Sequence, residues 1–172
     1  MKANKKRFVP YRRKLSGRTN YRKRLKMLVS GSPRLIVRKT NKNIIVQVAV
    51  YSENGDNVIA TTNSTELKKL GWNNATGNLP ASYLTGLLAG KKAISKKMTS
   101  AIVDLGLQTP AKGTRLFAAV KGAIDAGLKI PCSEDAFPTE DRIKGKHIAG
   151  FNKKASGIEK SFEDVKNSIL KK

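Results

Sequence analysis

The sequence predicts one α/β domain: a three-stranded antiparallel meander, a fourth strand added by a helical crossover, and helices packed on one face of the sheet. Three observations support this prediction. Residues 34–62 alternate apolar and polar side chains in three short runs, which is typical of half-buried strands. Residues 81–98 change to a helical period of three or four. A short apolar run at Ala101–Leu105 then predicts a buried strand, which a right-handed crossover places parallel to a neighbour in the sheet.

The meander comes first in the predicted domain. Strands are expected at Arg34–Lys39, Ile44–Tyr51 and Asn57–Thr62, and Asn54-Gly55 is a strong hairpin signal between the last two. Helices are expected to cover the face of the first strand that carries its aliphatic residues. Arg34 and Arg38 fall on the opposite face, where they are expected to be exposed.

The helices are predicted from apolar stripes. Residues 63–80 are expected to be a loop with one helical turn at Thr65–Leu70. The stripe of the helix after Ala81 consists of Leu84, Leu87, Leu88, Lys91, Ile94 and Met98. Thr114 is expected to cap a second helix with the stripe Phe117, Val120, Ile124 and Leu128. A final amphipathic helix carries Ile158, Phe162, Val165 and Ile169.

These elements divide the chain into three parts. Residues 1–20 form a basic extension, which we expect to be disordered alone because like charges repel and apolar content is low. Residues 21–130 form the α/β domain, which opens with a short helix at Tyr21–Leu28. Residues 131–172 form a C-terminal extension that contains the final helix.

Charge dominates the composition. The 172 residues include 35 Lys and Arg against 12 Asp and Glu, a net charge of +23. Residues 1–52 hold 16 of the basic residues and no acid. This excess indicates a polyanionic partner, nucleic acid first and an anionic membrane surface second. The apolar runs are too short to span a bilayer and no secretory signal is visible, so we expect a cytoplasmic protein without a membrane partner.

The residues do not assemble a catalytic, metal or cofactor site. Cys132 and His147 are the only cysteine and histidine, which excludes an internal disulfide and argues against a Cys/His zinc site. Gly86–Lys91 superficially resembles a phosphate-binding loop, but three residues separate its glycines where that loop needs four. Close helix packing is the better interpretation. The acidic pairs Glu134-Asp135 and Glu140-Asp141 are expected to make caps and ion pairs. We therefore predict a non-enzyme without metal, cofactor or small-molecule substrate.

The candidate RNA-binding residues combine cations, amides and aromatic rings. Arginine suits phosphates, asparagine suits hydroxyls and base edges, and aromatic faces stack on unpaired bases. From the N-terminal region the set contains Lys5, Lys6, Arg7, Tyr11, Arg12, Arg13, Lys14, Arg18, Tyr21, Arg22 and Arg24. From the sheet and its first turn it contains Arg34, Arg38, Lys39, Asn41 and Asn43.

Two further anion sites are predicted outside these regions. Thr114 and Arg115 open a helix, where free amides and the helix dipole favour a phosphate, although simple capping is an equal alternative. Lys146 and His147 follow Gly145 in what is expected to be a flexible basic turn.

Several segments carry a specific resemblance. They are Tyr21-Arg-Lys-Arg-Leu-Lys, Ser32-Pro-Arg-Leu-Ile-Val-Arg-Lys-Thr-Asn-Lys-Asn-Ile-Ile-Val-Gln47, Gly86-Leu-Leu-Ala-Gly-Lys-Lys92, Phe117-Ala-Ala-Val-Lys-Gly-Ala-Ile-Asp-Ala-Gly-Leu128 and Ile130-Pro-Cys-Ser-Glu-Asp-Ala-Phe-Pro138. In this order they closely resemble the universal 5S rRNA-binding family, large ribosomal subunit protein eighteen, in its longer archaeal-type form. The resemblance covers residues 5–151, and the final helix is its least specific part.

The resemblance implies a structural role in the large ribosomal subunit. Members of the family bind 5S rRNA and anchor it to the large, 23S-type rRNA beside other proteins of the central protuberance. By this resemblance, residues Lys5 to Arg24 would thread between RNA helices, and Arg34, Arg38, Lys39, Asn41 and Asn43 would meet 5S rRNA. A free-standing, non-specific RNA chaperone and a nucleic-acid-processing enzyme are the alternatives.

Overall fold

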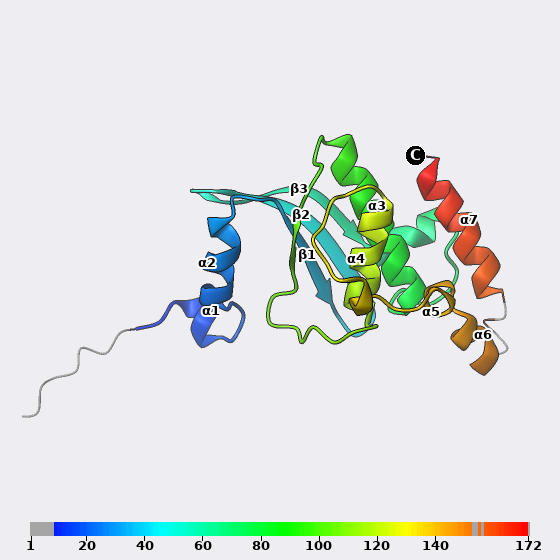
Figure 1. The fold of residues 1–172 in the computed structure, drawn as a ribbon. Coiled ribbons are helices and arrows are strands. Elements are labelled where there is room, and N and C mark those ends of the chain that lie inside the picture. The colour runs from blue at the N-terminus through cyan, green and yellow to red at the C-terminus, as the bar shows by residue number, and fades with distance from the viewer. Residues whose placement is uncertain (1–8, 153–154, 156, 172) are drawn as a thin grey trace, which may run out of the picture.

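The sheet has four strands in the order β3-β2-β1-β4 (Figure 1). The computed structural model describes residues 9–152, 155 and 157–171. Strand β2 (Ile44–Ser52) pairs antiparallel with both β1 (Arg34–Lys39) and β3 (Gly55–Asn63), whereas β4 (Ile102–Asp104) pairs parallel with β1. The predicted meander and the parallel fourth strand are confirmed.

One face of this sheet forms the main core. Leu35, Val37, Ile44, Val46 and Val48 are fully buried there, as their alternation predicts. Helix α3 (Leu79–Ser95) and helix α4 (Arg115–Asp125) cover this face (Figure 1). Asn78 caps α3 by accepting a hydrogen bond from the amide of Ala81, so the helix begins two residues before the predicted start.

Small residues set the contact between α3 and α4. A Cβ atom on Gly86 would lie 1.9 Å from the carbonyl oxygen of Ala119, and one on Gly122 would lie 2.1 Å from that of Tyr83. The prediction that glycine serves close helix packing is therefore confirmed. The predicted stripe of α4 is only partly right. Val120 and Leu128 are buried, but Phe117 and Ile124 are half-buried because alanine and glycine fill the face toward α3.

A second core lies on the far side of α3. It is built from the 3-10 helix η1 (Ser64–Leu70), α5 (Glu140–Lys144), α6 (Lys146–Phe151) and α7 (Ile158–Leu170). All four stripe residues of the predicted final helix are buried in α7. Trp72 is also fully buried, and its indole nitrogen donates to the carbonyl of Ala75. Because α3 lies between both cores, it is buried on nearly every side and is not the amphipathic helix that its stripe predicted.

One expectation about an irregular segment is wrong. In place of a flexible basic turn at residues 145–147, Gly145 joins α5 to α6 and is buried against Pro80 and Ile158, while Lys146 and His147 begin α6. The described part of the N-terminal extension contains a helical turn, α1 (Arg12–Leu15), and α2 (Tyr21–Val29) follows it. That the extension is disordered alone stays a prediction. Another short 3-10 turn, η2 (Glu134–Ala136), precedes α5. Within the described residues, no helix combines the length and hydrophobicity of a bilayer span.

Candidate nucleic-acid interface

Arg34 lies at the centre of an ion-pair cluster on the sheet face opposite α3 and α4. Its side chain is 1% exposed, so the expectation that it is an exposed RNA ligand on a solvated face is wrong. Its Nη2 lies 2.6 Å from Asp56 Oδ1, and its Nη1 donates to Asp104 Oδ2 at 3.3 Å. A buried arginine needs such partners because leaving a charge unpaired away from water is costly. Arg34 therefore holds the strands together and does not face solvent.

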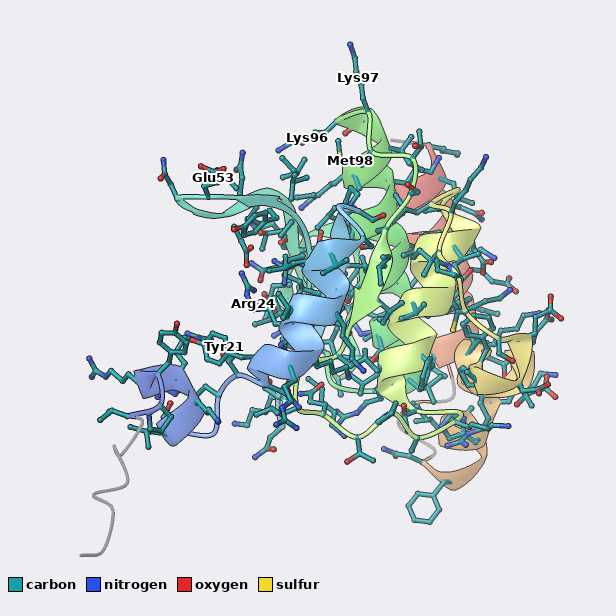
Figure 2. The ribbon with its side chains drawn as sticks, turned by 60° about the vertical axis from the view of Figure 1, so that its left-hand side comes forward. Tyr21, Arg24, Glu53, Lys96, Lys97 and Met98 are labelled. Carbon is teal, nitrogen blue, oxygen red and sulfur yellow. The ribbon has the colours of Figure 1, made fainter. Side chains whose placement is uncertain are left out.

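Asp56 also ties helix α2 to the sheet. Both of its carboxylate oxygens accept hydrogen bonds of 2.9 Å from the two Nη atoms of Arg24, the paired geometry that suits arginine best. This hydrogen bonding, together with the charge of Arg34, holds the pKa of Asp56 below its usual value although burial opposes the shift. Figure 2 shows Arg24 and Tyr21 on α2. The ion pair thus fixes one face of a strongly basic helix against the sheet.

Arg38 continues the cluster at its other end. Its Nη2 donates to Asp104 Oδ1 at 3.1 Å, and its Nη1 donates to the carbonyl of Asp104 at 2.6 Å. Gly106 lies beside it with a φ of +62°, and a Cβ atom there would come within 2.9 Å of the Arg38 guanidinium carbon. The Arg38 side chain remains 37% exposed. Unlike Arg34, Arg38 is therefore accessible to a ligand, and its contact with RNA stays a prediction.

These elements enclose a basic pocket of about 120 Å³. Its lining consists of Arg13, Arg18, Thr19, Asn20, Lys23, Arg24, Met27, Arg38, Asp104 and Gly106. Five of these side chains are cations and one is a carboxylate, which is already paired with two arginines. None of the ion pairs among the described residues involves Arg13, Arg18 or Lys23. The pocket therefore offers uncompensated positive charge, which suits a phosphate.

Two tyrosines lie close in the chain to residues that line the basic pocket, Tyr11 before Arg13 and Tyr21 after Asn20. The rings of Tyr11 and Tyr21 pack with their centroids 5.0 Å apart and their planes tilted by 42°. Tyr11 remains 66% exposed, so part of its surface is free. An exposed ring beside arginines is suited to stack on an unpaired base.

Comparison with known proteins identifies the family. The family described as "Ribosomal large subunit proteins 60S L5, and 50S L18" matches residues 5–100 and 95–133. "Large ribosomal subunit protein uL18" of Methanoregula boonei is 48% identical over 163 residues, 95% of this chain and 94% of the relative. The protein of the same name from Thermofilum pendens is 52% identical over 145 residues, 84% of this chain and 74% of the relative. The chain belongs to the uL18 family of large ribosomal subunit proteins.

Membership of the uL18 family settles the class of function. The chain is a structural constituent of the large ribosomal subunit, with ribosomal RNA and ribosomal proteins as its partners, and it is not an enzyme. The predicted cytoplasmic location in the ribosome is confirmed by the same membership. The nucleic-acid-processing enzyme considered from the sequence is thereby excluded.

The structure separates the other candidate residues into groups. Lys5, Lys6 and Arg7 lie outside the described residues. The exposed side chains close in the chain to the basic pocket, or at the end of β1 and in the turn after it, are Arg12, Lys14, Arg22, Lys39 and Asn41. These residues are available for contact with RNA.

Three of the remaining polar candidates make hydrogen bonds within the protein. Asn43 Oδ1 accepts hydrogen bonds from the hydroxyls of Thr76 and Ser64, at 2.7 Å and 3.4 Å. Arg115 Nη1 donates to the carbonyl of Gly77 at 2.5 Å. Thr114 occupies the N-cap position of α4, but its hydroxyl donates to the carbonyl of Ala111 and caps no helix amide. The bond between Asn43 and Thr76 joins the loop of residues 72–78 to the turn after β1, and the bond from Arg115 joins the same loop to the start of α4.

Sequence reasoning missed Lys23, Asp56 and Asp104 as parts of the site. Lys23 is exposed on α2 and reaches the carbonyl of Gly106 at 3.5 Å. The two aspartates lie 22 and 70 residues from Arg34 in the chain, and no local pattern links them to it. The local sequence offers one signal, an arginine directly before the apolar run Leu35–Val37. Cys132 is half-buried against the main core, and burial raises the pKa of its thiol.

Proposed function

We propose that this chain binds 5S rRNA within the large subunit and anchors it to the large rRNA in the central protuberance. The observation that carries the proposal is the basic pocket. It joins residues of the N-terminal extension, α2, β1 and the turn after β4, so its cations keep a fixed spacing. A fixed set of phosphate ligands favours one RNA shape over others, whereas a loose basic tail attracts every RNA.

The roles of the residues follow from their surroundings. Arg13, Arg18 and Lys23 have no carboxylate partner among the described ion pairs and would contact backbone phosphates. Arg38, Lys39 and Asn41 would extend the contact from the end of β1 into the turn that follows it, toward hydroxyls and base edges. Arg34 acts indirectly, because it holds Asp56 and Asp104, which in turn position Arg24 and Arg38. The resemblance noted in the sequence supports 5S rRNA as the partner.

Selective binding tests this proposal. The purified chain should bind 5S rRNA more tightly than a length-matched structured RNA at about 0.2–0.3 M salt, where non-specific attraction is strongly reduced. Filter binding or fluorescence anisotropy with both RNAs measures the preference. Equal and salt-labile binding to the two RNAs would leave only a general attraction between this basic ribosomal protein and RNA, and it would overturn the proposal.

A further inference from the structure

Phe151 is an aromatic side chain that does not pack into either core of the fold. It is 95% exposed, more than any other large hydrophobic residue that the structure describes. It ends helix α6, whose inward side is already filled because Ile148 and Ala149 pack against the second core. Full exposure of a phenylalanine forgoes the burial that normally stabilises such a side chain. The exposed ring of Phe151 therefore indicates a binding partner outside the fold.

The charge of the segment that carries Phe151 indicates the chemistry of that ligand. The sequence contains no Asp or Glu between Asp141 and Glu159, whereas the described residues of this stretch include Arg142, Lys144, Lys146 and His147. Lys146 forms an exposed ion pair with Asp141, with Nζ and Oδ1 2.6 Å apart. His147 is exposed on the same short helix. An exposed aromatic ring on a segment rich in cations suits a nucleotide, since the ring stacks on a base while the cations meet phosphates.

We infer that Phe151 stacks on an unpaired base of ribosomal RNA, with Lys144 and His147 contacting the adjoining backbone. This inference rests on the proposed function and adds a second RNA contact to it. Figure 1 shows α6 at the opposite end of the molecule from α1 and α2, which carry the cations of the basic pocket. The two surfaces would therefore engage different segments of RNA. Such an arrangement suits a protein that holds two RNA segments together.

Fluorescence at position 151 tests this inference. Phe151→Trp places an indole where the side chain is almost fully exposed, so the fold should be retained. The native Trp72 is fully buried and should not respond to stacking. A single-stranded adenylate oligonucleotide should quench the introduced indole strongly, and an RNA duplex of the same length should quench it weakly. The added variants Lys144→Ala and His147→Ala should raise the oligonucleotide concentration at half-quenching by about tenfold.

A matched control uses the exposed aromatic Tyr51, which is 51% exposed and lies opposite Asp56 in the β2–β3 hairpin. Tyr51→Trp should be quenched far less than Phe151→Trp. Equal quenching of the two variants, or no quenching of Phe151→Trp by the single strand, would overturn the inference. Binding of 5S rRNA is measured with the same Phe151→Trp sample. Loss of selective 5S rRNA binding would count against the proposed function, whereas absence of quenching alone would count against the role of Phe151.

Assembled large subunits distinguish RNA from protein as the partner of Phe151. Ultraviolet crosslinking through a photoreactive phenylalanine analogue at position 151 should join this residue to rRNA. A crosslink to a ribosomal protein alone would show that Phe151 docks into an apolar protein surface, and the inference would be wrong.

Discussion

Asp104→Asn should lower the free energy of unfolding by about 3 kcal/mol, because it removes one of the two carboxylates that compensate a buried arginine. Asp104 is 5% exposed, and its carboxylate binds Arg34, Arg38 and the amide of Gly106. The asparagine keeps the shape and one acceptor but loses the charge. Denaturant unfolding followed by circular dichroism measures the loss. The basic pocket should loosen as well, since Arg38 loses its main anchor.

Asp141→Asn is the matched control for this substitution. Asp141 also pairs with a cation, Lys146, but both side chains are largely exposed to solvent. Exposed ion pairs contribute little to stability because water and salt screen them. The unfolding midpoint of Asp141→Asn should therefore stay close to that of the wild type. If Asp104→Asn were as stable as this control, the buried cluster could not be what joins β1, β4 and α2.

Gly86→Ala should also destabilise the fold by about 3 kcal/mol, near the upper end of the usual cost of overpacking. The new methyl group would lie 1.9 Å from the carbonyl oxygen of Ala119 and 2.7 Å from its carbonyl carbon. These are backbone atoms of α4, so the two helices must separate to make room. This cost should exceed the gain of about 1 kcal/mol that alanine brings to a helix interior. Thermal or denaturant unfolding gives the measurement.

Gly150→Ala is the control for the effect of alanine itself. Gly150 is also helical, in α6, but a Cβ atom there would meet no atom within 4 Å. This variant should be as stable as the wild type or slightly more stable. Comparable losses at both positions would mean that the close contact between α3 and α4 does not limit stability.

Local sequence patterns predicted the helices and strands whose formation depends mainly on residues close in the chain. Alternation placed β1, β2 and β3, and the change to a helical period placed α3. The apolar run Ala101–Leu105 and the crossover rule placed the parallel β4. The stripe of α7 was predicted residue by residue. The buried face of α4 was predicted only in part: the stripe contained Val120, but Leu116 and the small residues Ala118, Ala119, Gly122 and Ala123 make up the rest of that face. Periodicity favours large apolar residues, so the small ones were missed. The composition of that face follows from how closely α3 approaches, which only the tertiary structure shows.

The candidate site was predictable in its charge but not in its arrangement. The excess of Lys and Arg in residues 1–52 indicated a polyanion correctly, and membership of a ribosomal protein family agrees with it. The burial of Arg34 was missed because its partners, Asp56 and Asp104, come from other strands. The same long-range contacts create the basic pocket. Composition therefore predicts the class of partner, while the spacing of the cations depends on the complete fold.

Two variants of equal charge test most directly whether the basic pocket binds 5S rRNA. One replaces Arg13, Arg18 and Lys23 with alanine, and the other replaces Lys68, Lys69 and Lys171, which are exposed on η1 and at the end of α7. Both proteins lose three positive charges, so general attraction to RNA falls equally. Affinity for 5S rRNA is measured for each variant over a series of salt concentrations.

The pocket variant should bind 5S rRNA at least about tenfold more weakly than the control variant. Its salt dependence should also flatten, by up to roughly 0.7–0.9 in slope for each lost phosphate contact. If both variants lost the same affinity and the same slope, net charge alone would explain binding. That result would contradict the assignment of the basic pocket as the 5S rRNA site.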